Sequence, residues 1–246
     1  MSHIRIEVDE VSFGYEAQTK VLEDITFRAG EREAIGIIGA NGAGKSTLLK
    51  LLVGLYPDFE GSIRVEDIPV EKKMLARVRE KIGYVFSDAD SQLFLSTVCQ
   101  DVAFAPRNYG LAEKEVERRT DQALRMVRIE HLKNRRIHEL SGGEKKLVSI
   151  ATVLSMTPDI LLMDEPSIAL DPQNRRNLIR ILNGFEHLKL IASHDLDMIL
   201  DTCGRAILMN RGRIVADGAA GKILADRELL EENGLELPLR YGGSYA

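Results

Sequence analysis

The chain has no tryptophan among its 246 residues, and only 5% of its residues are aromatic. Cysteine is equally scarce, because Cys99 and Cys203 lie far apart and form no CxxC pair. Such sparse cysteines exclude a disulfide framework and favour reduced thiols. No group of histidine, cysteine and aspartate has the spacing of metal ligands, so we expect no direct transition-metal site.

Long hydrophobic runs are also missing. The longest apolar run without a charge, residues 147–157, is well short of the roughly 20 residues that cross a bilayer. Charged residues at positions 5, 7, 9 and 10 interrupt the first stretch of the sequence, so we expect no signal peptide. If the protein works at a membrane, another chain is expected to span it.

An excess of positive charge is absent too. The net charge is −5, the isoelectric point is about 5.7, and no basic tract stands out. A nucleic-acid partner is therefore not expected. The 44% of hydrophobic and 29% of charged residues are ordinary for a soluble globular protein, and the length suits one large domain or two small ones.

What the sequence does contain is an alternation of two hydrophobic periods. Short apolar or alternating runs predict strands, and apolar residues three or four positions apart predict helices. The predicted strands lie at residues 4–8, 25–27, 33–38, 62–65, 82–86, 160–163 and 190–192, with a hairpin of 206–209 and 213–216. One helix is predicted to start at residue 45, and three others are predicted at 116–127, 147–154 and 178–185. This alternation argues for a mostly parallel sheet covered on both faces, with a helical block at 87–155 inserted into it.

The segment GANGAGKS, residues 39–46, matches the phosphate-loop pattern G-x-x-x-x-G-K-[ST]. A predicted strand precedes it and a predicted helix follows it, as a P-loop requires. In such a loop, glycines let backbone N–H groups surround the phosphates, Lys45 supplies a positive charge, and Ser46 offers a hydroxyl to Mg²⁺. A glycine-rich turn that only caps a helix is the plain alternative, which the flanking elements disfavour.

A second motif, ILLMDE at residues 160–165, is an apolar strand that ends in two acids. In P-loop enzymes the first such acid, here Asp164, holds the Mg²⁺ shell. The second, Glu165, is placed to orient and deprotonate an attacking water. Acids also end strands and cap helices for purely structural reasons, but the pairing with a P-loop favours the catalytic interpretation.

A third motif, LSGGE at residues 140–144, has two compatible explanations. Ser141 and Glu144 have the spacing of a capping box ahead of an apolar helical face. Two glycines in a first helical turn cost roughly 1 kcal/mol each, and close approach of the backbone to a ligand would explain them. A capped helix still presents N–H groups outwards, so one segment can do both.

These motifs, followed by SIALDP and Ser193-His194-Asp195, occur in the order and at the spacings of the ATP-binding-cassette (ABC) ATPases, which the chain resembles over residues 3 to about 218. The resemblance implies an α/β fold: a P-loop NTPase (RecA-like) core with a mostly parallel sheet, an N-terminal antiparallel β-subdomain and an inserted α-helical subdomain. It implies one ABC ATPase domain over 1–246. The core with the β-subdomain would cover 1–86 and 156–218, the helical subdomain 87–155, and a short C-terminal helical tail 219–246.

The resemblance also implies roles for single residues. Tyr15 is similar to the aromatic residue that stacks on adenine, although a tyrosine in a hairpin turn is the plainer explanation. Asp171 is similar to the D-loop aspartate that acts across a dimer, and it is also a good N-cap before Pro172. His194 is similar to the switch histidine that touches the γ-phosphate.

Taken together, the implied site has four groups of residues. The nucleotide-binding residues are Tyr15, Gly39, Ala40, Asn41, Gly42, Ala43, Gly44, Lys45, Ser46 and Thr47. The catalytic residues are Lys45, Glu165 and His194, and the Mg²⁺ residues are Ser46 and Asp164. The signature residues, which contact the ATP of a second copy, are Ser141, Gly142, Gly143 and Glu144.

Residues 86–111 resemble the energy-coupling-factor ATPases, the ABC subunits that power uptake of cobalt, nickel and vitamins. In that group this region touches the membrane subunit. Part of the apolar set Leu93, Phe94, Val98 and Phe104 is therefore expected at the surface, although all four could be core residues.

The same region departs from the family pattern. Ser87 stands where the family usually has glutamine, and we expect a water molecule to bridge Ser87 to the Mg²⁺ shell. Gln92 lies nearby and is assigned with Ser87 to the coupling region. Ala105 and Ala169 stand where glycine is commoner.

The resemblance implies an ATPase that uses ATP and Mg²⁺ to power import of nickel or cobalt through a separate membrane complex. A vitamin importer of the same group, another ABC importer and, less so, a soluble non-transport ABC protein are the alternatives. A P-loop module that does not hydrolyse ATP is disfavoured by the intact Glu165 and His194. The expected partners are a second ATPase subunit in a head-to-tail homodimer and integral membrane subunits at the cytoplasmic face, and no nucleic acid.

Overall fold

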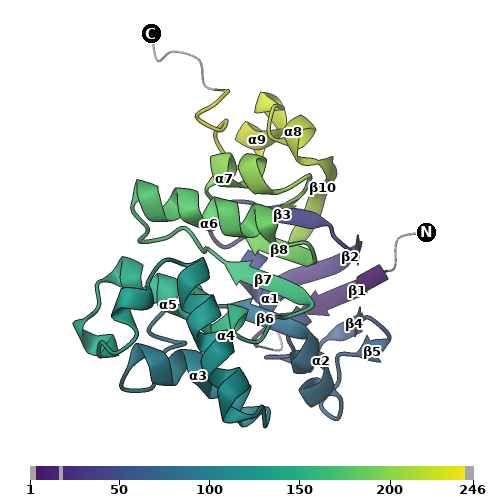
Figure 1. Cartoon of the computed structure of the whole chain (residues 1–246). Coiled ribbons are helices and arrows are strands. Elements are labelled where there is room, and N and C mark those ends of the chain that lie inside the picture. Colours follow the sequence, from purple (N-terminus) through teal and green to yellow (C-terminus); the bar gives the residue numbers. More distant parts are fainter. Residues whose placement is uncertain (1–3, 17–18, 242–246) are drawn as a thin grey trace. The chain divides into compact units, whose positions relative to one another are not determined.

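The computed structural model describes residues 4–16 and 19–241. The chain divides into two compact units, drawn together in Figure 1. The first consists of Met1–Ile82, Ile160–Asp164 and Glu186–Ala246, and the second of Gly83–Asp159 and Glu165–Phe185. Each unit is therefore built from segments that are far apart in the sequence.

The first unit contains an antiparallel sheet with the strand order β2-β1-β4-β5. Its strands are β1 (Ile4–Phe13), β2 (Leu22–Gly30), β4 (Glu60–Val65) and β5 (Ile68–Pro69). In β2, buried Ile25, Phe27 and Ala29 alternate with exposed residues, so one face of the strand packs inwards. The predicted N-terminal antiparallel β-subdomain is confirmed.

The first unit also holds five successive strands of a second sheet, in the order β10-β9-β3-β8-β7. They are β3 (Ala34–Ile38), β7 (Ile160–Asp164), β8 (Leu188–Ala192), β9 (Arg205–Asn210) and β10 (Arg213–Ala219). Strand β3 pairs in parallel with β8 and β9, and β7 pairs in parallel with β8. Every residue of β7 and β8 is buried, as in a sheet covered on both faces. The predicted parallel sheet and its closing hairpin are confirmed.

Among its described residues, the first unit contains five helices. They are α1 (Lys45–Leu52), α2 (Leu75–Lys81), α7 (Leu196–Thr202), α8 (Ala220–Ile223) and α9 (Arg227–Glu232). A Cβ atom built at Gly36 of β3 would lie only 2.4 Å from Cγ2 of Ile199, so glycine there lets α7 pack closely on the sheet. The hydrophobic periodicity does not predict α2 or α7, because seven residues cover only two helical turns.

The second unit is mainly helical. Its elements are β6 (Ile82–Val85), α3 (Val98–Asn108), α4 (Glu113–Met126), η1 (Glu130–Leu132), η2 (Ile137–Glu139), α5 (Gly142–Leu154) and α6 (Pro172–Gly184). Helices α3, α4 and α5 pack on one another (Figure 1), and Val102, Leu124 and Leu147 on these helices are buried. The helical block predicted between residues 87 and 155 is therefore present.

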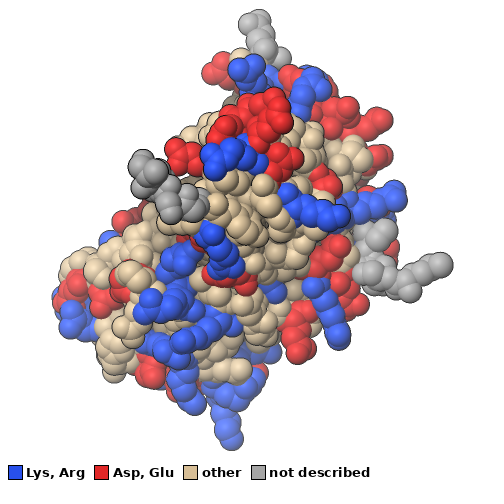
Figure 2. Space-filling view, turned by 90° about the horizontal axis from the view of Figure 1, so that it is seen from above, with Lys and Arg blue, Asp and Glu red and all other residues tan. Residues whose placement is uncertain are grey.

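The surface seen in Figure 2 carries charged side chains of both signs among uncharged ones. This mixture agrees with a composition in which 38 acidic residues outnumber 33 basic ones. Mixed charge of this kind is typical of a globular protein surface.

Candidate functional site

The P-loop joins β3 to α1, and its backbone requires glycine at three positions. Gly42 and Gly44 have φ angles of 80° and 102°, in the left-handed region that other residues rarely adopt. At Gly39 an added Cβ would lie 2.2 Å from the carbonyl oxygen of Met209. The loop thus has the left-handed turns with which backbone N–H groups form an anion-binding nest.

Lys45 begins α1 directly behind this loop and is only 7% exposed. Its ammonium group donates to the carbonyl oxygens of Gly39 and Ala40, at 2.7 and 3.2 Å. The positive charge therefore lies at the loop itself, where an anion cradled by the backbone would meet it.

Ser46, the next residue, connects the P-loop to the end of β7. Its hydroxyl donates to Oδ1 of Asp164 at 2.8 Å. Asp164 is 1% exposed, and its other carboxylate oxygen, Oδ2, has no hydrogen-bond partner in the described part of the chain. A buried carboxylate oxygen without a donor is unfavourable unless a cation or another donor supplies the missing interaction. The Ser46 hydroxyl and the Asp164 carboxylate are oxygen ligands of the kind that Mg²⁺ prefers.

His194 follows β8, which lies between β3 and β7 in the sheet. Ala192, the last residue of β8, is paired with Ile37 of β3 and with Asp164 of β7. The P-loop, Asp164 and His194 consequently share the carboxyl edge of three neighbouring parallel strands, the usual ligand-binding edge of such sheets. His194 is exposed at this edge.

Tyr15 is placed beside the P-loop helix. Its hydroxyl lies 3.0 Å from Oγ1 of Thr47, and its ring packs edge-on against Phe13 and Tyr56, with centroid distances of 5.1 and 5.2 Å. The ring is still 53% exposed. Tyr15 therefore keeps a free aromatic surface next to the predicted nucleotide-binding residues, and adenine stacking stays a prediction.

Glu165 directly follows Asp164 in the chain and belongs to the second unit. It is half-buried, and its φ angle of 47° is unusual for a residue with a side chain. Backbone strain of this kind is characteristic of functional positions and costs on the order of 1–3 kcal/mol. The strain agrees with a special role for Glu165 but does not define it.

The signature segment forms the expected capping box at the start of α5. The backbone N–H of Glu144 donates to Oγ of Ser141, while the N–H and hydroxyl of Ser141 both donate to Oε2 of Glu144 at 2.8 Å. These bonds, first of all the one from the Ser141 backbone, lower the pKa of the Glu144 carboxyl. The capping interpretation of LSGGE is confirmed.

The two signature glycines differ in what surrounds them. A Cβ built at Gly143 would lie 2.8 Å from the carbonyl oxygen of Ala169, whereas one at Gly142 would meet nothing closer than 3.8 Å. Packing within the chain therefore requires glycine at Gly143. It does not require glycine at Gly142, for which approach to a ligand remains the better explanation.

Ala169 and Asp171 lie in the loop before α6. Asp171 accepts the backbone N–H groups of Gln173 and Asn174, both at 2.8 Å, so it is the predicted N-cap. Ala169 has a φ angle of 66°, which explains physically why glycine is commoner at this position. A role of Asp171 across a dimer stays a prediction.

Ser87 and Gln92 are both tied to the signature helix α5. The ammonium group of Lys146 donates to the carbonyl oxygens of Phe86 and Ser87, at 2.8 and 2.9 Å. The amide of Gln92 donates to the carbonyl oxygen of Ser149 at 2.7 Å and accepts from the backbone N–H of Phe86. Lys146 is 2% exposed, and no motif in the sequence predicted a role for this residue.

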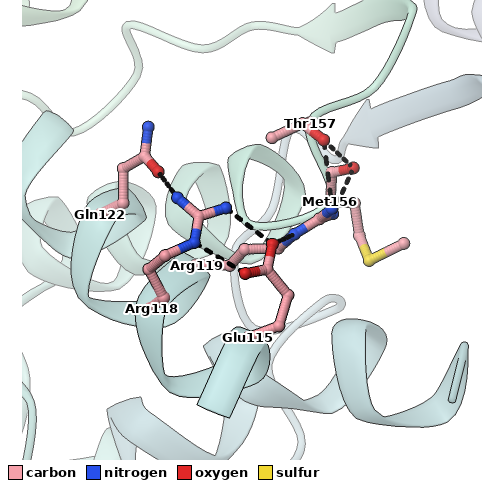
Figure 3. Close-up of polar contacts among 6 residues, drawn as sticks. All are labelled: Glu115, Arg118, Arg119, Gln122, Met156 and Thr157. Atoms are coloured by element: carbon pink, nitrogen blue, oxygen red, sulfur yellow. Dashed lines mark hydrogen bonds and ion pairs between the residues drawn. The ribbon is translucent and has the colours of Figure 1, made fainter. Parts of the chain in front are cut away.

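The opposite end of α5 is held by α4 (Figure 3). Glu115 accepts from Arg118 and Arg119, and Arg119 also donates at 3.4 Å to the carbonyl oxygen of Met156, just beyond α5. The two guanidinium groups, with Arg118 contributing most, lower the pKa of Glu115 to about 2. The signature helix is therefore fixed within its unit at both ends.

The apolar set in the coupling region is divided between core and surface. Leu93 and Val98 are buried, whereas Phe94 and Phe104 are 65% and 42% exposed and pack edge-to-face with their centroids 4.9 Å apart. The buried Asp101 carboxylate accepts the backbone N–H of Phe94 at 3.2 Å, which anchors this aromatic pair. Phe94 also lines a hollow of about 530 Å³, and the expectation that part of the set is exposed is confirmed.

Two features bear on membranes and metals. In the described residues, no helix is both long and apolar enough to cross a bilayer. The same residues contain no group of three or more His, Cys, Asp and Glu side chains that could hold a metal ion.

Comparison with known proteins adds independent observations. The sequence model of the family described as "ABC transporter" matches residues 22–168. A Geobacter sulfurreducens protein named as an ABC transporter ATP-binding protein is 48% identical, over 99% of this chain and 98% of its own length. The energy-coupling factor transporter ATP-binding protein EcfA of Carboxydothermus hydrogenoformans is 40% identical, over 96% of this chain and 88% of its own.

Among solved structures, the cbiO1 protein of Clostridium perfringens, described as part of the ABC transporter complex cbiONQ, is similar with a TM-score of 0.81. It is 35% identical to this chain, and the match covers 94% of each chain. Sequence motifs, fold and relatives therefore agree. The chain belongs to the ABC transporter family, and it is an ATP-binding subunit of an ABC transporter with the P-loop fold and the ATPase activity of that family.

Proposed function

We propose that ATP hydrolysis by this chain powers import of a transition-metal ion, nickel or cobalt, through a separate membrane complex. The observation that carries this proposal is the anchored, exposed pair Phe94 and Phe104, within a segment that resembles the energy-coupling-factor ATPases. The similarity to EcfA and to cbiO1 supports the same group of transporters. A vitamin importer of that group is the second candidate, supported by the same relatives.

For the chemistry, we assign the phosphates of ATP to the P-loop and Lys45. Ser46 and Asp164 would hold Mg²⁺, because the buried Oδ2 of Asp164 needs a cationic or hydrogen-donating neighbour. When bound, Mg²⁺ neutralises charge on the transferring phosphoryl group. Glu165 orients and deprotonates the attacking water, His194 fixes the water and the γ-phosphate, and Tyr15 stacks on adenine. Positioning and charge stabilisation supply most of the rate enhancement.

We assign a trans role to the signature segment. Gly142 is left without close neighbours at the N-terminus of a capped helix of 13 residues, where backbone N–H groups favour an anion. In a head-to-tail homodimer, Ser141, Gly142, Gly143 and Glu144 of one copy would meet the nucleotide on the P-loop of the other. Asp171 would contact the partner copy next to the same nucleotide. Such a dimer has two equivalent composite sites.

The membrane partner is assigned to the surface around Phe94 and Phe104. Ser87 and Gln92 lie in the same segment, which α5 holds through Lys146, so the coupling region and the signature helix form one packed body. The Ser87 hydroxyl would reach the Mg²⁺ shell through a water molecule. We place the chain at the cytoplasmic face of the membrane as one cassette domain, with no nucleic-acid partner.

Co-purification and uptake test the transport role. A tagged chain is purified from native membranes in mild detergent, and uptake of radioactive nickel, cobalt and vitamins is measured in cells that lack the gene. We expect integral membrane subunits to co-purify and metal uptake to fall, with recovery by the wild type but not by Glu165→Gln. Normal metal uptake together with lost vitamin uptake would instead establish the second candidate.

A Phe94→Ser/Phe104→Ser double variant tests the docking surface. It should hydrolyse ATP as an isolated subunit at the wild-type rate but lose co-purification, because the exposed pair contributes little to the core. Tyr241→Ser, at an exposed aromatic residue outside residues 86–111, is the control. Retained co-purification by the double variant would place the partner elsewhere.

A further inference from the structure

The segment after α9 contacts the structure around the P-loop through a buried amide. Asn233 follows α9 and is only 7% exposed. Its Oδ1 accepts from Nδ2 of Asn210 at 2.8 Å, and its own Nδ2 donates to the carbonyl oxygen of Leu229 at 2.8 Å. The first of these bonds links the end of β9 to the segment after α9, and the second fixes the Asn233 side chain to α9.

Asn210 ends the strand whose turn holds the P-loop. The backbone N–H of Gly212 donates to the carbonyl oxygen of Ala43 at 3.1 Å. On the other side of the turn, the carbonyl oxygen of Met209 leaves no space for a side chain at Gly39. The turn between β9 and β10 therefore supports the P-loop at both of its ends.

The residue after Asn233, Gly234, lies near the P-loop. Gly234 has a φ angle of 72°, and a Cβ built on it would lie 3.6 Å from Cβ of Ala40. Its backbone N–H donates to the carbonyl oxygen of Glu231, as is typical where a helix ends in a left-handed residue. The fully buried Leu230 fixes α9 to the same unit.

We propose that Asn233 is a positioning residue for nucleotide binding, which holds the P-loop through its hydrogen bond to Asn210 and the turn that follows Asn210. The argument rests on the assignment of the phosphates to the P-loop. Gly39, Gly42 and Gly44 must keep their positive φ angles for the loop to cradle an anion, and a loop supported from two sides loses less entropy when it binds. The link to α9 supplies one of these supports.

The consequence is a specific change in affinity. Asn233→Ala removes the acceptor of the half-buried Asn210 amide, and loss of this bond favours rearrangement of the turn. We expect the Kd of a fluorescent ATP analogue and the KM for ATP to rise about three- to tenfold, since the net effect of one hydrogen bond is of that order. The kcat should change by less than about twofold, because Asn233 is not among the residues assigned to the reacting phosphate or the attacking water.

Glu232→Ala is the matched control, because Glu232 is exposed and adjacent in the chain. Asn210→Ala should weaken binding to the same extent as Asn233→Ala, and the double variant should be no weaker than either single one. If Asn233→Ala does not fold, Asn210→Ala carries the test alone, with its thermal unfolding measured alongside.

An Asn233→Ala or Asn210→Ala protein that is folded and binds the analogue with wild-type affinity would overturn the proposal. So would additive effects of the two substitutions, because the residues would then act independently. The Lys45→Ala variant distinguishes failure of the Asn233 proposal from failure of the P-loop assignment. If Lys45→Ala also binds normally, the nucleotide site itself is misassigned.

Discussion

The hydroxyl of Ser46 donates to Oδ1 of Asp164 across 2.8 Å, joining two residues that are 118 positions apart in the sequence. Asp164 keeps a second, buried oxygen without a partner among the described residues. The hydrogen bond thus links the P-loop to strand β7, and Oδ2 of Asp164 is left to accept a cation.

The first prediction concerns this pair. Asp164→Asn should lower the apparent Mg²⁺ affinity of the ATP complex about 10- to 100-fold, as expected for removal of a partner of the metal shell. Binding of ATP without Mg²⁺ should be almost unchanged, because Lys45 and the loop backbone are untouched. Titration of Mg²⁺ against hydrolysis and nucleotide binding measures both. Asp9→Asn, an exposed strand residue, is the control, and unchanged Mg²⁺ dependence in Asp164→Asn would remove the aspartate from the metal site.

The second prediction concerns Lys146, which donates to two carbonyl oxygens of the coupling segment. Lys146→Met should destabilise the protein by about 1–3 kcal/mol, because both carbonyl oxygens lose the charged donor that the buried Lys146 side chain supplies. Lys145 provides a matched control on the same helix. It pairs with the exposed Asp90, so Lys145→Met should cost less than about 1 kcal/mol. Denaturant unfolding measures both, and equal effects would mean that the contact of Lys146 is not a buried support.

The third prediction concerns Ala169, whose φ angle is 66°. Ala169→Gly should stabilise the protein by about 1 kcal/mol, because glycine adopts this backbone without the clash of a Cβ. Replacement of alanine by glycine inside a helix should instead lower the stability. Ala105→Gly in α3 should destabilise by about 1 kcal/mol, and thermal unfolding compares the two. Destabilisation by Ala169→Gly would show that the left-handed conformation is not the native one.

The fourth prediction follows from the pKa of Glu115, which Arg118 and Arg119 lower to about 2 (Figure 3). The folded-state pKa lies below the unfolded value of about 4.5, so the ion-paired carboxylate favours the folded state above pH 4.5. That contribution is lost as the pH falls from 4.5 towards 2. The difference in unfolding free energy between the wild type and Glu115→Gln should therefore be larger at pH 7 than at pH 3.5.

Glu117→Gln on the same helix is the control for this pH dependence. Glu117 is exposed, so its substitution gives the reference for removing a surface carboxylate from α4. A pH-independent difference for Glu115→Gln would contradict the ion-paired arrangement in Figure 3.

The local parts of the site are predictable from sequence, and the structure shows why. The P-loop glycines are required by their own backbone angles, and the capping bonds of Ser141 and Asp171 involve residues no more than three positions away. Patterns of this kind are complete within one short segment, so the sequence contains the full physical reason for them.

The contacts between distant segments could not be predicted in the same way. Lys146 and Phe86 are 60 positions apart, and nothing in a helical pattern tells a buried lysine from an exposed one. Asn233 and Asn210 form a single hydrogen bond between segments that have no shared periodicity. The close approach of Ala169 to Gly143 likewise depends on how α5 packs, so the structural reason for Gly143 appears only in the fold.

In the proposed dimer, the P-loop of one copy and the signature segment of another form one ATP site. Lys45→Ala removes the phosphate contact of the P-loop, and Gly142→Asp adds a carboxylate at a position that the chain's own packing leaves open. Each variant alone should be almost inactive, while Gly142→Asp should still bind ATP.

A mixture of equal amounts of the two inactive variants tests whether two copies share one site. In a head-to-tail dimer, half of the mixed dimers contain one chain of each kind, and each of these has one intact composite site. We expect the mixture to recover about a quarter of the wild-type ATPase rate, provided that one intact site suffices. A mixture that stays as inactive as its two components would show that the signature segment does not complete the site of another copy.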